Sequence, residues 1–408
     1  MYLCSTPPGA SSDDDDGYAA VDVSAYFIAN KRKVAWCSSD DERERSVDVK
    51  KRLLKRRLVA SVSLACASMM EAYCRYRGGV QELRNYEVGD KQFDPNSFCD
   101  KMFVSWFRFE RFQIEMMIRD LNLPDIIISS DRDRAPVFEV FCLLCAKYAY
   151  PVRFCQLIRE FYRSASAMSR LIKTLRKLLY FRFSDRLRHP PPLDAEQCAC
   201  FASKSRSICG HPIVVGFIDG TVREICRPTK LQGPLYSGKD RIHSLKYQAI
   251  NTPDGIIRHL AGPYPGSRHD QFMLRESGIL DWIAEFPTQQ GTNWPHVIYA
   301  DLGYSVVPGC IEVPFHDEAI NVMHAAYNHA MSSARISVEW AFGAILRHWA
   351  SLRYVPQQQL LSNRKIGQVF FVAALLTNCL NCVHPNQTAQ YFQCTPPSLE
   401  AYLAWLKC

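Results

Sequence analysis

The chain has 408 residues, of which 48% are hydrophobic, so we expect a sizeable core and two or three domains. A formal net charge of +8 favours an acidic partner but is too small to identify nucleic-acid binding by itself. The 17 cysteines are odd in number and no apolar signal peptide opens the chain, so we expect reduced thiols inside the cell rather than a disulfide framework. The run at residues 58–70, taken as the longest apolar one, is shorter than the ~20 residues that span a bilayer, so we expect no membrane segment.

The first part of the chain is acidic and then basic. Residues 1–45 carry the runs SSDDDDG and DDERER with few regular apolar repeats, which predicts a disordered acidic leader. Residues 46–190 become helical in character, and the basic block KKRLLKRR at residues 50–57 stands near their start. Such a block is typical of a nuclear import signal and equally typical of a solvated helix face.

An aromatic stripe runs through residues 98–121 at mixed helical offsets, and we expect it to pack in a core. Helical patterns follow at residues 137–150 and 154–162, and then a serine-rich turn in which Ser164 or Ser166 is placed to cap the next helix. That helix is basic. The succession resembles a helix-turn-helix unit, which predicts either DNA contact or a packing module. The residues concerned are Phe103, Trp106, Phe107, Phe109 and Phe112 in the stripe, and Arg170, Lys173, Arg176 and Lys177 in the basic helix.

Two C-x-x-C pairs, Cys142/Cys145 and Cys379/Cys382, raise the question of a zinc site. Both pairs lie in strongly apolar stretches typical of helix interiors, where cysteine behaves as a small buried hydrophobe. Because no His or Cys cluster accompanies either pair at finger-like spacing, we expect no structural zinc.

Three consecutive prolines after His189 cannot continue a helix and mark a linker. We therefore expect a new domain over residues 195–384 and a C-terminal tail over residues 385–408. In the new domain, Asp219 ends an apolar run typical of a central strand, and a hairpin is predicted at Thr252-Pro253-Asp254-Gly255. A helical pattern over residues 272–286 follows the motif GSRHD, which ends at Asp270.

Two further acids follow in the same domain. Asp301 ends a buried strand pattern, and Glu339 follows in a helical pattern, with 37 residues between the two acids. Each acid alone has a simpler explanation, since Asp-Gly is a common turn signal and an acid on an amphipathic helix usually faces solvent. Together, acids at two strand ends and on a following helix predict a site for two divalent cations that prefer oxygen ligands.

The runs GFIDGTVREICRP, LYSGKDRIHSLKYQAINTPDGI, GPYPGSRHD and MSSARISVEWAFGAI resemble the PIF/Harbinger transposase superfamily and the nucleases derived from Harbinger transposases. The resemblance covers roughly residues 95–405. It implies an α/β RNase H-like nuclease domain preceded by an all-α helix-turn-helix-type region. The strand, hairpin, helix, strand and helix order expected above is also that of an RNase H-like fold.

Carried over residue by residue, the resemblance implies catalysis by Asp219, Asp301 and Glu339, with two Mg²⁺ or Mn²⁺ ions as cofactors. Asp270 competes for the second position, and we prefer Asp301 because it ends a strand and because the 37-residue interval fits the family. Asp270 is then an auxiliary metal ligand. His269 and Arg335 are expected to support the ligands, and Lys239, Arg241 and Arg347 to contact DNA phosphates.

The predicted function is metal-dependent DNA endonuclease activity of DDE transposase type, with strand transfer in a working transposase. Two alternatives stay open: a domesticated DNA or chromatin-binding factor without catalysis, and RNase H-like hydrolysis of RNA. The expected partners are duplex DNA, a second copy of the chain and a Myb/SANT-like accessory DNA-binding protein, with a nuclear location.

Overall fold

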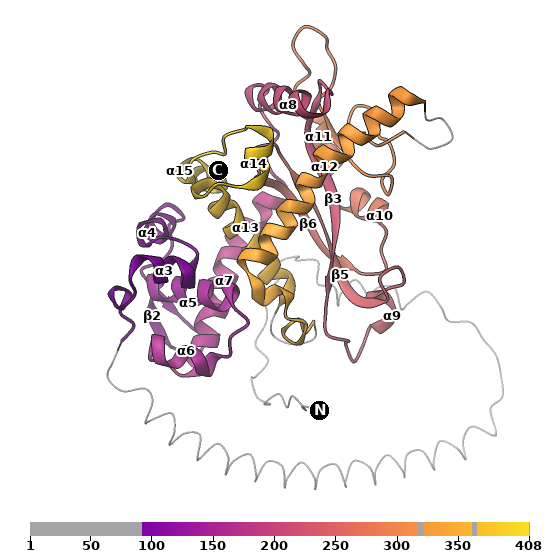
Figure 1. Cartoon of the computed structure of the whole chain (residues 1–408). Helices are drawn as coiled ribbons and strands as arrows, with labels where there is room; N and C mark the ends of the chain where they lie inside the picture. The colour runs from indigo at the N-terminus through magenta and orange to yellow at the C-terminus, as the bar shows by residue number, and fades with distance from the viewer. Residues whose placement is uncertain (1–91, 316–320, 361–364, 408) are drawn as a thin grey trace, which may run out of the picture. The chain divides into compact units, whose positions relative to one another are not determined.

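In the computed structural model, the described residues 92–315, 321–360 and 365–407 form a mixed α/β fold with one six-stranded sheet, one small hairpin and many helices (Figure 1). The acidic leader, the basic block at 50–57 and the apolar run at 58–70 lie outside the described residues.

The region before the sheet is mainly helical. Ser164 caps its longest helix by accepting a hydrogen bond from the backbone N–H of Ala167 at 3.2 Å, so the first of the two candidate serines is the cap. The elements are η2 (Pro95–Ser97), α3 (Asp100–Phe107), α4 (Arg111–Asp120), β1 (Ile126–Ile128), β2 (Arg134–Pro136), α5 (Val137–Ala149), α6 (Phe154–Phe161) and α7 (Ala165–Arg188).

The aromatic stripe is divided between two helices. Arg108 adopts a left-handed conformation with φ of 71°, which ends α3 and turns the chain into α4. Phe103, Phe107 and Phe109 are buried as predicted, whereas Phe112 is 54% exposed. The prediction of core packing was wrong for Phe112, because the chain turns between the helices and the residue falls on the outer face of α4.

Helix α7 uses half of its predicted basic residues inside the protein. Arg170 forms ion pairs with Asp133 at 2.6 Å and Asp131 at 3.2 Å, and Arg176 is only 6% exposed. Burial lowers the pKa of Arg176. Since α7 packs against α5, α13 and β6, it belongs to the core of the described residues.

The chain then passes through Pro190 to Pro192 into the sheet region, which contains all six strands of the sheet. The pattern at residues 272–286, predicted as one helix, is two short helices, because Gly278 between them has φ of 67°. The elements are α8 (Ala195–Cys209), β3 (Val214–Glu224), α9 (Gln232–Leu235), β4 (Tyr236–Ser237), β5 (Ile242–Asn251), β6 (Ile257–Pro265), α10 (Asp270–Glu276), α11 (Ile279–Ala284), β7 (Val297–Tyr299), β8 (Ile311–Glu312), α12 (Val322–His348), η4 (Ala350–Arg353), η5 (Val355–Gln357), α13 (Ile366–Val383), α14 (Gln387–Phe392) and α15 (Leu399–Lys407).

Strand β3 is central in the sheet. It pairs antiparallel with β5 on one side and parallel with β7 on the other, and β7 pairs parallel with β8. Strand β5 also pairs antiparallel with β6 and, at its opposite end, with β4. Helices α8 and α12 contact β3 and each other, while α7 and α13 contact β6 (Figure 1). One continuous apolar core reaches from Phe98 to Leu406, so the segment at 385–408 that was predicted as a tail contains packed helices.

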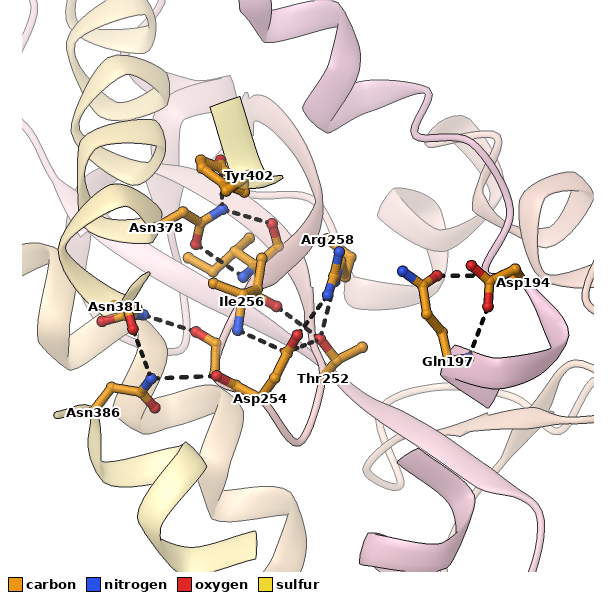
Figure 2. Close-up of polar contacts among 12 residues, drawn as sticks. Asp194, Gln197, Thr252, Asp254, Ile256, Arg258, Asn378, Asn381, Asn386 and Tyr402 are labelled. Carbon is orange, nitrogen blue, oxygen red and sulfur yellow. Dashed lines mark hydrogen bonds and ion pairs between the residues drawn. The ribbon is translucent and has the colours of Figure 1, made fainter. Parts of the chain in front are cut away.

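The predicted hairpin between β5 and β6 is present, and its turn is buried under the C-terminal helices (Figure 2). Asn381 donates to the backbone oxygen of Gly255 at 2.7 Å, and Asn386 donates to that of Asp254 at 3.2 Å. Asn378 pairs with both the N–H and the carbonyl of Ile257, at 3.0 and 2.9 Å. These asparagines supply partners for backbone groups that burial removes from water.

A buried ion pair completes this turn. The Asp254 carboxylate accepts bonds from the hydroxyl of Thr252, the backbone N–H of Ile256 and the guanidinium of Arg258. Asp254 is 2% exposed and Arg258 6%. We call these residues, together with Asn378, Asn381 and Asn386, the turn clamp.

Helix α13 carries the second C-x-x-C pair and, among the described residues, is the helix long and apolar enough to cross a membrane. This stretch is longer than the one at residues 58–70, so the latter is not the longest apolar run. Since 72% of α13 is buried against other elements, we interpret it as a core helix. Cys142, Cys145 and Cys379 are fully buried free thiols, and burial raises the pKa of each, which disfavours the thiolate that binds zinc.

Candidate active site

The parallel pairing of β3 and β7 positions the first two acids. Phe217 of β3 is aligned with Tyr299 of β7, and Asp219 and Asp301 each follow two residues later. Neighbouring strands lie about 4.8 Å apart, so this register places the two aspartates side by side. Asp301 lies just past the end of β7, whereas Asp219, predicted at a strand end, lies within β3, which continues to Glu224. In each case one carboxylate oxygen accepts a nearby backbone N–H, from Gly220 at 2.8 Å and from Gly303 at 2.9 Å.

Helix α12 brings the third acid to the same place. Arg335 donates from Nη1 to Oδ2 of Asp219 at 3.1 Å and from Nη2 to Oε1 of Glu339 at 3.2 Å. Glu339 is one helical turn after Arg335, and its side chain is 49% exposed, compared with 17% for that of Asp219. The structure therefore joins Asp219 and Glu339 through one guanidinium.

Asp219 is the acid whose protonation the fold changes most clearly. Burial raises the pKa of Asp219 from 3.8 to about 6, against the opposing effects of Arg335 and the Gly220 N–H. The negative charges of Asp301 and Glu339 raise it further. Like charges held close together are typical of sites that bind cations or use a carboxyl group chemically.

Asp270, the first residue of α10, also belongs to this group. A Cβ atom at Gly303 would lie 3.0 Å from Oδ1 of Asp301 and 3.1 Å from Oδ2 of Asp270, so these two oxygens are at most about 6 Å apart. A Cβ atom at Gly220 would lie 3.1 Å from the other Asp270 oxygen. Glycine at both positions leaves room for the Asp270 carboxylate beside Asp219 and Asp301, and the choice between Asp270 and Asp301 stays open.

Two residues that sequence reasoning did not select support these acids. Tyr304 is 4% exposed, and burial and the charges of Asp270, Asp219 and Asp301 hold its pKa well above the ordinary value. Its hydroxyl contacts Oε1 of Gln248 at 3.3 Å. Lys246 of β5 lies 3.7 Å from Asp270 and donates to the carbonyl of Arg268 at 2.7 Å. For Tyr304, the sequence signal was its place three residues after Asp301, where it closes the turn.

The remaining predicted residues are exposed, and only His269 is next to one of the acids, through its place in the chain. Because Asp219 lies opposite Ala249, the start of β5 lies several residues along the strands from the acids. His269 precedes α10 and is exposed next to Asp270. Lys239 and Arg241 are exposed in the turn between β4 and β5, and Arg347 is exposed in the last turn of α12, eight residues after Glu339 or about 12 Å along the helix. Arg335, by contrast, contacts two acids directly, as a supporting residue would.

The donor chemistry fits hard divalent cations, because four carboxylates gather here and such ions prefer oxygen ligands. Within the described parts of the chain, however, no three His, Cys, Asp or Glu side chains are already arranged as a metal-holding group. Arg335 is instead the cation between Asp219 and Glu339. The residues therefore fit a metal by type.

Comparison with known proteins agrees with this geometry. Residues 218–378 match the family model described as DDE superfamily endonuclease, and this range includes all four acids. The chain is also similar to "Protein ALP1-like" of Arabidopsis thaliana, with 21% identity over 187 residues, which are 44% of this chain and 45% of that protein. The match thus covers less than half of the relative's length. No solved structure gives a significant match. Residues 218–378 are accordingly identified as a DDE superfamily endonuclease domain.

Proposed function

We propose that this protein is a metal-dependent DNA endonuclease of the PIF/Harbinger DDE transposase type, built on an RNase H-like sheet. The observation that carries the proposal is the convergence of Asp219, Asp301 and Glu339 from β3, β7 and α12 within the matched domain. The strand order β6, β5, β3, β7, β8, with antiparallel pairing from β6 to β3 and parallel pairing from β3 to β8, supports the RNase H-like assignment.

In this proposal Asp219, Asp301 and Glu339 hold two Mg²⁺ or Mn²⁺ ions, with Asp270 as a further oxygen ligand. Such ions supply activation of water and stabilisation of the departing 3′ oxygen of a phosphodiester. The protein's own groups do the positioning. The backbone N–H groups of Gly220 and Gly303 orient two of the carboxylates, and Tyr304 and Lys246 border Asp270 on its buried side. Exposed Lys239, Arg241 and Arg347 contact phosphates on either side, and His269 orients Asp270.

The test is cleavage of duplex DNA that carries the sequences flanking the protein's own gene, with Mg²⁺, with Mn²⁺ and with a chelator. We expect metal-dependent nicking that Asp301→Asn reduces at least ~100-fold, because the substitution removes a charged ligand while keeping the size of the side chain. Asp281→Asn, at an exposed position of α11, is the matched control and should cut normally. Equal nicking by the Asp301→Asn and wild-type proteins would contradict the assignment. An RNA–DNA hybrid cut faster than duplex DNA would favour RNA hydrolysis instead.

A second candidate is a DNA or chromatin-binding factor that keeps the fold without cleavage. The position of Arg335 between Asp219 and Glu339 favours it, since this arrangement partly offsets the charges of two of the acids without any metal. For such a protein we expect DNA binding that is indifferent to chelator and unchanged by Asp301→Asn. Duplex DNA, a second copy of the chain, a Myb/SANT-like accessory protein and a nuclear location remain predictions from the family resemblance.

A further inference from the structure

We infer that Arg335 is an internal counter-ion that competes with divalent metal for the acids of the site. The inference rests on the proposed function, because it concerns regulation of that same site. In the metal-free protein the guanidinium holds Asp219 and Glu339 together. A metal ion that binds these acids coordinates carboxylate oxygens that accept hydrogen bonds from Arg335 in the metal-free protein.

The hydrogen bonds at Asp219 lead to this conclusion. Its Oδ1 accepts the Gly220 N–H at 2.8 Å, and its Oδ2 accepts Nη1 of Arg335 at 3.1 Å. The oxygen that is not bound to the local backbone is therefore the one that the guanidinium covers. At Glu339 the same guanidinium covers Oε1 through its second nitrogen, at 3.2 Å.

The charges of the site explain why both cations are not accommodated at once. A Mg²⁺ ion binds oxygen at about 2.1 Å, so an ion on Oδ2 of Asp219 would lie within roughly 5 Å of an Arg335 nitrogen bound to the same oxygen. The side chains of Asp219 and Arg335 are only 17% and 20% exposed, so water screens their charges weakly. The repulsion therefore lowers metal affinity unless Arg335 moves.

Removal of the guanidinium charge should thus strengthen metal binding while weakening the metal-free protein. We would titrate the full chain with Mn²⁺ alone in a calorimeter, and record thermal unfolding with and without Mn²⁺. For Arg335→Gln we expect Mn²⁺ affinity about tenfold or more above wild type, a lower metal-free melting temperature, and a larger rise on adding Mn²⁺. Arg335→Lys keeps the charge but lacks the two-pronged geometry, so it should fall between the two. Arg159→Gln, on an exposed face of α6, is the matched control and should equal wild type in Mn²⁺ affinity and in melting temperature.

Unchanged or weaker Mn²⁺ binding by Arg335→Gln would overturn the inference. Asp301→Asn separates this result from failure of the proposed function. If Asp301→Asn weakens Mn²⁺ binding while Arg335→Gln has no effect, the metal site stands and the counter-ion role is wrong. If Asp301→Asn binds Mn²⁺ as wild type does, or if neither wild type nor Arg335→Gln binds it, the metal site itself is wrong.

Discussion

The sheet carries two polar clusters, one buried and one partly exposed, that are satisfied in opposite ways. At the turn between β5 and β6, the turn clamp pairs the Asp254 carboxylate with Arg258, Thr252 and a backbone N–H, and asparagines bond the surrounding backbone (Figure 2). Where β3 and β7 bring Asp219 and Asp301 side by side, four carboxylates gather, of which Arg335 contacts Asp219 and Glu339, and Lys246 lies near Asp270.

The difference is one of charge balance. The turn clamp offsets the cost of burial within itself, so it contributes to stability and leaves no group for a ligand. The acid cluster keeps more negative than positive charge close together, and the charges of Asp301 and Glu339 add to the burial that raises the pKa of Asp219. Buried polar groups that stabilise a fold and those that serve chemistry are thus distinguished by whether their partners are complete.

The largest effect should come from breaking the turn clamp. Asp254→Ala leaves Arg258 charged, unpaired and only 6% exposed, so we expect a loss of about 3–5 kcal/mol in the free energy of unfolding. Urea unfolding of the full chain measures this loss. The double variant Asp254→Ala with Arg258→Met should recover much of it, and a double variant as unstable as the single one would show that the ion pair is not the cause.

In the acid cluster, removal of a buried carboxylate charge should increase the stability of the metal-free protein instead of decreasing it. Because Asp219 has a pKa of about 6 when folded and 3.8 as the reference value, the folded protein takes up this proton first as pH falls. The wild type therefore gains stability from this group as pH falls from about 6 to about 4, and bears the cost of the ionised form at pH 7. We expect Asp219→Asn to stabilise the metal-free protein by up to about 3 kcal/mol at pH 7 and by almost nothing at pH 4.

Unfolding experiments on both proteins at the two pH values, with a chelator present, measure this gain. A variant that is less stable than wild type at pH 7 would mean that Arg335 outweighs the cost of burying Asp219.

The smallest effect should come from Glu339→Gln. The Glu339 side chain is half exposed, and its contact with Arg335 is open to solvent, so we expect a change within about 0.5 kcal/mol in metal-free stability. Thermal and urea unfolding at pH 7 provide the measurement. A loss above 2 kcal/mol would place Glu339 with the turn clamp as a structural residue.

Sequence patterns predicted the parts that depend on local chemistry. The hairpin was visible because Thr252-Pro253-Asp254-Gly255 is strong turn chemistry, and Gly255 has the positive φ of 81° that such a turn requires. The strand before Asp301 and the helix around Glu339 were visible because apolar residues recur at strand and helix periods. Conversely, Gly278 divides a region predicted as one helix, since a single glycine is a weak stop signal within an apolar pattern.

Contacts between distant segments were not predictable in the same way. The proximity of Asp270 to Asp219 and Asp301 depends on Gly220 in β3 and on Gly303 in the turn after β7, and no local pattern reports it. Lys246, Tyr304 and Gln248 were missed because isolated polar residues inside strand and turn patterns have many ordinary explanations. Similarly, the inward orientation of Arg170 and Arg176 on α7 depends on partners from other elements.

One helix carries both Glu339 and the arginine that covers it, four residues apart. Movement of α12 as a rigid body alters the distance from Arg335 to Asp219 on β3, but it leaves Arg335 and Glu339 travelling together. The contact between Arg335 and Glu339 therefore opens by a rotamer change. The contact between Arg335 and Asp219 opens either by a rotamer change or by a displacement of α12. Rotamer changes take picoseconds to nanoseconds and helix shifts microseconds or longer, so opening of the Asp219 contact by helix displacement is separable in time from a rotamer change at Glu339.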